Sequence, residues 1–198
     1  MSHYPAFLEL AGRSAVVVGG GRVAERKALA LLKADAEVTL ISPELTPRLG
    51  RLVEKGRVSH RARRYRKGDV KDAFLVVAAT DSGAVNARVA GDAPCLCNVA
   101  DAPELSNFIV PSVLDRGDLS IAVSTAGVSP ALARSIRLEL ENRYGPEFRD
   151  YLNKIKTERK RVMKTIKDPA ERRRYLKGLG REGAPEAIRK GSRGQGRG

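Results

Sequence analysis

A strand-like run of valines is followed directly by three consecutive glycines, Gly19, Gly20 and Gly21. With the residues up to Ala24 they fit the pattern G-x-G-x-x-A. The first glycine of this pattern makes a tight turn, the second lets a pyrophosphate touch the backbone, and the small last residue lets a helix pack closely on the strand. That helix begins at Arg22-Val23 and offers free N–H groups to phosphates. The motif predicts a dinucleotide site; the alternative is a turn that holds no ligand.

The type of dinucleotide depends on the end of the next strand. NAD-binding domains place an acidic residue there, about 20 residues after the glycines, to hold the ribose hydroxyls. Here the strand ends at Ser42, Pro43 and Glu44, so the acid comes slightly late. Glu44 disfavours a 2′-phosphate, whereas Arg48 and the basic run 61–67 favour one. We predict NAD, with NADP left open.

Polar residues also follow two later strands. Thr80 and Asp81 come after one of them, and Asn98 and Asp101 come at the end of the next. Ligands of doubly wound sheets bind at the carboxyl ends of the strands, so we expect Thr80 and Asp81 near the cofactor and Asn98 near a substrate. Asp101 leads into a loop instead of capping a helix, which makes it a candidate general base. A carboxylate that makes only a local turn is the alternative.

A second candidate anion site lies before a helix that starts with proline. Its residues are small and precede or begin that helix: Ser124, Thr125, Ala126, Gly127 and Ser129. Such residues leave backbone N–H groups unobstructed, and Arg134 adds a positive charge one turn into the helix. We expect this segment to bind an anionic substrate; an ordinary capped helix is the alternative.

The elements that must position these residues alternate along the first half of the chain. Apolar runs predict strands, and apolar residues at helical spacing predict helices between them. The expected strands are 14–19, 36–42, 57–61, 73–80 and 94–100, and the expected helices are 22–33, 45–55 and 83–92. This alternation predicts an α/β fold with a Rossmann-like, doubly wound parallel sheet.

The pattern changes after residue 107. Residues 108–127 predict two β segments around a turn at 115–117. Ser129 and Gly145 are the expected N-cap and C-terminal stop of one helix. Basic helices broken at Asp168-Pro169 are expected to follow. We divide the chain into a cofactor domain, a small α+β dimerisation region, a basic helical region and a disordered tail, at 1–112, 113–146, 147–189 and 190–198.

Charge is distributed unevenly over the 198 residues. The formal net charge is +14, of which residues 149–198 carry +11, with 17 Lys or Arg and 6 Asp or Glu. A basic tail binds nucleic acid, an acidic surface or a polyanionic ligand, or is simply a solvated helical face. No apolar run reaches the roughly 20 residues of a membrane span, and the N-terminus has no signal-peptide pattern. With Cys95 and Cys97 interpreted as reduced core thiols, we expect a cytoplasmic protein.

Three segments together carry a family resemblance. They are FLELAGRSAVVVGGGRVAERKALALL, VVAATDSGAVNARV and CNVADAPELSNFIVPSVLDRGDLSIAVSTAGVSPALAR. In this order they resemble precorrin-2 dehydrogenase, the N-terminal module of siroheme synthase, over roughly residues 3–145. The resemblance implies a homodimer that oxidises precorrin-2 to sirohydrochlorin with NAD, and in some relatives also inserts iron.

The resemblance also implies roles for particular residues. Asp101 corresponds to the aspartate regarded as catalytic, and the backbone at Arg22-Val23 and Pro43-Glu44 corresponds to NAD contacts. Some members have SSGG before this helix, with a serine that can be phosphorylated, whereas this sequence has STAG at 124–127, which puts that control in doubt. We predict no resident metal site. The alternative function is a nucleotide-sensing regulator whose basic tail binds nucleic acid.

Overall fold

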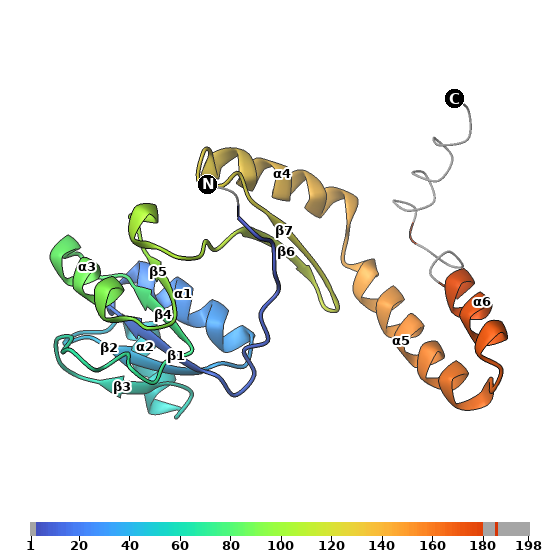
Figure 1. Cartoon of the computed structure of the whole chain (residues 1–198), viewed down its shortest axis with the longest axis horizontal. Helices are drawn as coiled ribbons and strands as arrows, with labels where there is room; N and C mark the ends of the chain where they lie inside the picture. Colours follow the sequence, from blue (N-terminus) through green and yellow to red (C-terminus); the bar gives the residue numbers. More distant parts are fainter. Residues whose placement is uncertain (1–2, 180–184, 186–198) are drawn as a thin grey trace. The chain divides into compact units, whose positions relative to one another are not determined.

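The computed structural model describes residues 3–179 and residue 185 (Figure 1). The chain forms two compact units, Met1–Val110 and Pro111–Gly198, each described here by itself. The predicted disordered tail, 190–198, lies outside the described residues.

A five-stranded parallel sheet forms the centre of the first unit, with the strand order β3-β2-β1-β4-β5. The strands are β1 Ser14–Val18, β2 Glu37–Ile41, β3 Ser59–Arg61, β4 Leu75–Ala78 and β5 Leu96–Val99. The helices between them are α1 Arg22–Lys33, α2 Pro47–Glu54 and α3 Gly83–Asp92, and a short 3₁₀ turn, η1, spans Pro103–Leu105. Because every neighbouring pair is parallel, all five strands end at one edge of the sheet.

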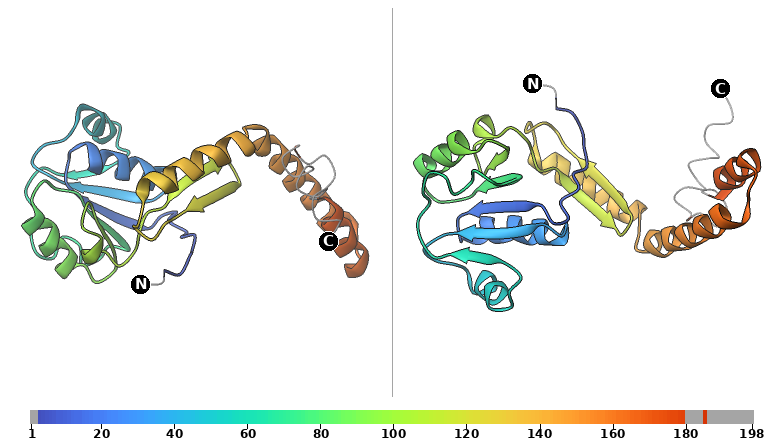
Figure 2. Two further views of the ribbon diagram at one scale, coloured as in Figure 1. Left: turned by 90° about the horizontal axis from the view of Figure 1, so that it is seen from above. Right: turned by 60° about the horizontal axis from the view of Figure 1, so that its bottom comes forward.

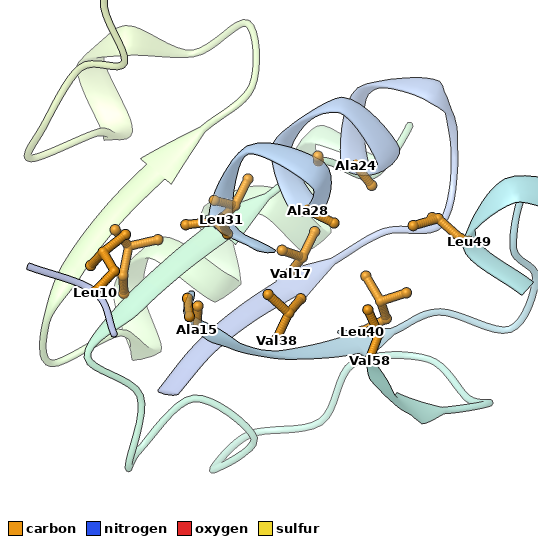
Figure 3. Packing of buried hydrophobic residues seen from close by; sticks show 14 residues of the cluster. Leu10, Ala15, Val17, Ala24, Ala28, Leu31, Val38, Leu40, Leu49 and Val58 are labelled. Atoms are coloured by element: carbon orange, nitrogen blue, oxygen red, sulfur yellow. The ribbon is translucent and has the colours of Figure 1, made fainter. Parts of the chain in front are cut away.

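Helix α1 packs on the sheet through small residues. Ala24 and Ala28 are fully buried, and with Leu31 they point toward Val17 and Val38 of the sheet (Figure 3). An alanine at each contact brings the helix axis close to the strands, so the helix N-terminus lies directly at the end of β1. Helix α2 adds Leu49 to the same core.

The opposite face of the sheet has its own core. Val16, Val76 and Val99 of the strands pack there with Val89 of α3 and with Tyr65. Strands buried on both faces explain the continuous apolar runs of β1 and β4. The predicted Rossmann-like, doubly wound sheet is confirmed, and each expected strand and helix of the first unit is present with ends shifted by only a few residues.

The second unit begins with the antiparallel pair β6 Ser112–Arg116 and β7 Leu119–Val123, along which α4 Pro130–Arg143 lies (Figure 2). The turn of this hairpin is Gly117-Asp118, not the predicted 115–117, because Arg116 still pairs with Leu119. Leu114 of β6 is fully buried and Ala133 of α4 nearly so.

Two further helices follow, α5 Glu147–Thr165 and α6 Pro169–Leu179. Ser129 caps α4 by accepting a hydrogen bond from the Leu132 N–H, as predicted. The break before α6 is also confirmed: Asp168 accepts a hydrogen bond from the Glu171 N–H at 2.7 Å and so caps the new helix. In the described ranges, no helix is long and apolar enough to cross a membrane.

Candidate functional site

The glycine turn joins the end of β1 to α1, and each of its three residues is a glycine for a different reason. Gly19 has φ +128°, and a Cβ there would lie 2.2 Å from the backbone oxygen of Ala79. The turn therefore packs directly on the end of β4, which only a glycine allows.

Gly20 packs on the segment that follows β2. A Cβ at Gly20 would lie 1.8 Å from the backbone oxygen of Glu44, and the Gly20 carbonyl accepts a hydrogen bond from the Thr46 N–H. Thr46 also donates from its hydroxyl to Glu25, so the first turn of α1 and the end of β2 are tied together. The middle glycine thus serves close packing between two loops.

Gly21 is different because nothing in the described protein requires a glycine there. It is the N-cap of α1 with extended backbone, φ −81° and ψ −173°, and a Cβ at this position would meet no atom within 4 Å. No side chain caps the helix, so its first N–H groups stay available to an anion. This open backbone beside a helix N-terminus fits the pyrophosphate of a dinucleotide.

The end of β2 is where the cofactor's adenosine ribose binds in this type of fold. Ser42 is buried, whereas Pro43 and Glu44 are exposed. Three of the cations that favour a 2′-phosphate are paired: Arg48 lies 3.7 Å from Glu25, and Arg61 and Arg63 both bind Asp69 at 2.9 and 2.7 Å.

Asp69 holds this basic segment together. Its carboxylate accepts from Arg63, Arg61 and the Arg66 N–H, and its side chain is only 7% exposed. These interactions, the Arg63 hydrogen bond foremost, lower the pKa of Asp69 from 3.8 to about 2. Asp69 is a functional residue that sequence reasoning missed; its position two residues after the basic run 61–67 was its local signal.

The end of β4 forms a tight polar network. The Thr80 N–H and hydroxyl both donate to Oδ1 of the buried Asn86, whose Nδ2 donates to the Thr80 carbonyl. Thr80 therefore supports the wall on which Gly19 packs. Asp81 next to it is exposed. Asn86, at the first turn of α3, is a further residue that sequence reasoning missed.

After β5 the chain makes a closed loop, residues 99–106. The Ser106 hydroxyl oxygen accepts from the Val99 N–H at 2.9 Å and donates to the Ala102 carbonyl, and the Asn107 side chain bonds the backbone of β5. Asp101 stands in this loop with φ +59°, a left-handed conformation that is uncommon for a residue other than glycine.

The Asp101 side chain is exposed, and no other residue of the described ranges forms a hydrogen bond with its carboxylate. Neither does it cap η1, which has no side-chain cap. Asp101 itself stands in a turn, but its carboxylate forms none of that turn's hydrogen bonds in the described residues. The strained backbone and the free carboxylate make Asp101 the candidate reactive group of the first unit.

Asn98, by contrast, is buried and fully engaged. Its Oδ1 accepts a hydrogen bond from Lys27 Nζ at 3.0 Å, and its Nδ2 donates to the Phe108 carbonyl at 3.1 Å. Burial is the main cause that lowers the pKa of Lys27; Arg26 lowers it further, and Asp101 raises it. Lys27 is a further residue that sequence reasoning missed, because a lysine in a helix such as α1 is ordinarily a solvent-exposed residue.

The second unit holds the other predicted group, from Ser124 to Arg134. The loop is closed by its own hydroxyls: Ser124 accepts from the Ala126 N–H, and Thr125 accepts from the Ser129 N–H. The Val128 N–H also donates to the Thr125 carbonyl. The expectation that several N–H groups lie unobstructed here is therefore wrong for these three, because short side chains accept from two of them and a backbone carbonyl accepts from the third.

Two residues of this loop have left-handed backbone, Ala126 at φ +51° and Gly127 at φ +86°. Gly127 and Arg134 are exposed. The structure thus brings the predicted residues of each unit together within that unit.

The residues with metal-binding side chains are dispersed. Throughout the described part of the chain, no three His, Cys, Asp or Glu residues gather where they could hold an ion. Cys95 and Cys97 are free thiols against the α3 face of the sheet, and burial raises the pKa of Cys97 to about 11. Iron insertion, which the resemblance implies for some relatives, stays a prediction.

The fold and the open glycine turn define a dinucleotide-binding α/β domain followed by a smaller α+β unit. Two family models match these two parts: one described as putative NAD(P)-binding over residues 6–112, and one described as sirohaem biosynthesis protein central over residues 116–143. The chain belongs to the putative NAD(P)-binding family.

Individual relatives agree with this assignment. Siroheme synthase of Methylobacillus flagellatus is 45% identical over 144 residues, which are 71% of this chain and 31% of the relative. Siroheme synthase of Nitrosospira multiformis is 39% identical over 192 residues, 88% of this chain and 39% of the relative. The chain therefore spans only about a third of the length of these relatives.

This chain matches most of the length of one solved structure. SirC, precorrin-2 dehydrogenase, superimposes with a TM-score of 0.80 at 27% identity over 89% of each chain. The resemblance to precorrin-2 dehydrogenase predicted from the sequence is confirmed. None of these relatives supports the alternative of a nucleic-acid-binding regulator.

Proposed function

We propose that the chain is a precorrin-2 dehydrogenase that oxidises precorrin-2 to sirohydrochlorin with NAD. One observation carries the proposal: the open backbone at Gly21 and Asp101 lie at the same edge of one sheet. The backbone of Asp101 is strained, and its carboxylate forms no hydrogen bond with another described residue. The strands that lead to them, β1 and β5, are separated only by β4, which corresponds to about 10 Å. A dinucleotide held by its pyrophosphate at Gly21 and a general base on the neighbouring loop can act on one substrate.

Each group has a chemical role in this oxidation, which removes a hydride and a proton from the substrate. NAD supplies the hydride acceptor when it is bound. Asp101 accepts the proton on a carboxylate oxygen, and such a base contributes typically 10²- to 10⁴-fold to the rate. The left-handed backbone at Asp101 keeps the carboxylate out of local hydrogen bonds and so available for this transfer.

NAD is favoured over NADP by the pairing of the arginines. A 2′-phosphate needs free cations at the end of β2, but Arg61 and Arg63 are held by Asp69. The exposed Glu44 adds a negative charge at that end of the strand. Among the residues predicted to contact NAD, Gly21, Arg22 and Val23 provide the phosphate site, whereas Gly19, Gly20 and Thr80 shape it.

The substrate carries eight carboxylates, which explains the need for exposed cations. In the second unit Arg134 stands on the first turns of α4, and the Gly127 N–H belongs to an exposed turn. We assign the segment from Ser124 to Arg134 to substrate binding, with Thr125 and Ser129 as the residues that shape the loop. Asn98 acts through its neighbours and not by touching substrate.

We also propose that the protein is a cytoplasmic homodimer, and exposed residues of the second unit support the dimer. Large apolar side chains of β6, α4 and the loop before it are exposed, namely Val113, Val128, Leu132 and Leu138. Val128 is 87% exposed, which is unusual for a valine in a folded unit. A second copy of residues 113–146 would bury these side chains.

An absorbance assay tests the proposal directly. Purified protein is mixed with precorrin-2 and either NAD or NADP, and the spectra of sirohydrochlorin and reduced cofactor are followed. We expect turnover with NAD. The Asp101→Asn variant keeps a residue that tolerates the left-handed backbone, so we expect kcat to fall 10²- to 10⁴-fold with an unchanged Kd for NAD. A flat trace from the unaltered protein would refute the proposal, and an unchanged kcat would remove Asp101 from it.

A further inference from the structure

Lys27 is a charged residue on the face of α1 that is otherwise apolar. It lies on the side of α1 that packs on the sheet, one turn from the fully buried Ala24 and next to Ala28. Leu96 and Ala100 of the β5 segment pack into the core on that face, and Asn98 stands between them. A half-buried lysine and a buried amide beside apolar side chains cost free energy unless they are hydrogen-bonded, and here Lys27 and Asn98 are bonded to each other.

The pair is connected to the candidate base through the backbone. Asn98 accepts a hydrogen bond from Lys27 and donates one to the Phe108 carbonyl. Asn98 and Phe108 flank the loop that carries Asp101. Ser106 closes that loop from within. Lys27 therefore hydrogen-bonds to Asn98, the residue just before this loop, although the two are 71 residues apart in the sequence.

Charge connects the same residues a second time. The Lys27 ammonium is near enough to Asp101 for their attraction to oppose the effect of burial on the lysine. The charged groups that act on the Lys27 ammonium are Arg26 of the same helix, which repels it, and Asp101, which attracts it. Lys27 is the one of these cations that also forms a hydrogen bond to the strand, so far as the structure describes the chain.

We propose that Lys27 is a positioning residue, which fixes the Asp101 loop through its hydrogen bond to Asn98 and its attraction to the carboxylate. The proposal rests on the proposed function, because it takes Asp101 as the base. A displacement of a reacting group by about 1 Å costs up to 10²-fold in rate, so a loosened loop is sufficient to slow catalysis.

A purely structural role of Lys27 predicts that kcat stays unchanged as long as the variant is folded. Lys27→Met leaves the buried Asn98 Oδ1 atom without its donor, so its thermal midpoint should fall. At a temperature well below that midpoint, kcat should still fall about 10- to 100-fold. Lys27→Arg keeps a charged donor and should recover kcat to within a few-fold of the unaltered protein.

The test compares these two variants with Arg26→Met, which removes a neighbouring cation from the same helix but no hydrogen bond to Asn98. Steady-state assays give kcat and the KM for NAD separately, and melting curves give the midpoint. Hydrogen exchange of peptides covering residues 99–106, without substrate, measures the loop itself. We expect exchange to accelerate about tenfold in Lys27→Met alone, and the KM for NAD to change less than threefold in all variants.

The outcomes separate two kinds of failure. Unchanged kcat and unchanged exchange in Lys27→Met overturn the positioning role, as does an equal loss of kcat in Arg26→Met. A loss of kcat in Lys27→Met that only matches the fraction of unfolded protein at the assay temperature also overturns it, since that is the signature of a residue needed only for folding. If the unaltered protein oxidises no precorrin-2 but exchange still accelerates in Lys27→Met, the proposed function fails and the link from Lys27 to the loop stands.

Discussion

The two units of the chain use their apolar residues in opposite ways. In the first unit, four strands contribute fully or nearly fully buried side chains to cores on both faces of the sheet. In the second unit the β6–β7 pair is covered by α4, and among its described residues the fully or nearly fully buried apolar side chains are few: Leu114 in β6, Ala133 in α4, and Phe148 and Val162 in α5. At the same time Val128 and Leu132 are 87% and 52% exposed.

This difference indicates which functions each unit can perform alone. The first unit completes its own core, so backbone geometry at the glycine turn and at Asp101 is fixed without help. The second unit leaves apolar surface that another protein surface would bury, which fits the proposed dimer. The predictions below would break or sharpen this contrast, beginning with the largest expected effect.

Gly19→Ala should destabilise the first unit by about 3 kcal/mol or more. The left-handed backbone costs 1–3 kcal/mol for a residue other than glycine, and the new Cβ would overlap the Ala79 carbonyl. Urea unfolding of the cofactor-free protein measures this loss. Unchanged stability would mean that the glycine turn is not fixed by packing.

Gly21→Ser should have little effect on folding but weaken NAD binding about 10- to 100-fold. Serine is a good N-cap, and its Cβ meets no protein atom, so only a bound pyrophosphate would contact it. Calorimetric titration with NAD gives the Kd, and the melting midpoint serves as the control. Normal NAD affinity in this variant would place the pyrophosphate elsewhere.

Asp69→Asn should destabilise the protein by about 1–2 kcal/mol at neutral pH, after allowance for solvent screening of the partly exposed arginines. Since the pKa of Asp69 is lower in the folded state, the stabilisation is present above pH 3.8 and is lost as the pH falls toward about 2. The two proteins should therefore converge in stability at low pH, as measured by urea unfolding between pH 2 and 7.

The same variant frees Arg61 and Arg63, so the ratio of NADP to NAD turnover should rise. An unchanged ratio would show that these arginines do not face the cofactor.

Leu132→Ser should change the unfolding free energy of the monomer by less than about 0.5 kcal/mol, because the side chain is already half exposed. It should nevertheless weaken self-association about tenfold, as measured by sedimentation of the protein in the analytical ultracentrifuge at several concentrations. Lys71→Ser, an exposed change in the first unit, is the control. Equal association of all three proteins would remove α4 from the interface.

Much of this architecture could be predicted from local patterns. The valine run of β1, the glycine turn and α1 follow from residue types within 20 positions, and so does the helix break at Asp168-Pro169. Local reasoning failed where hydroxyls took up N–H groups, as in the Thr125 loop. It also could not decide the roles of Asn86 and Asp69, whose partners depend on side-chain rotamers.

The sequence by itself determined which segments form the strands and helices of the first unit, where the dinucleotide motif lies, and that Asp101 is the candidate base. Periodicity, caps and turns are short-range effects, so they are legible without a structure. Tertiary structure alone decided that Gly20 packs on Glu44, that Asp101 takes a left-handed backbone and that Lys27 reaches Asn98. These contacts join residues distant in sequence, and they form only when the strands have been brought side by side.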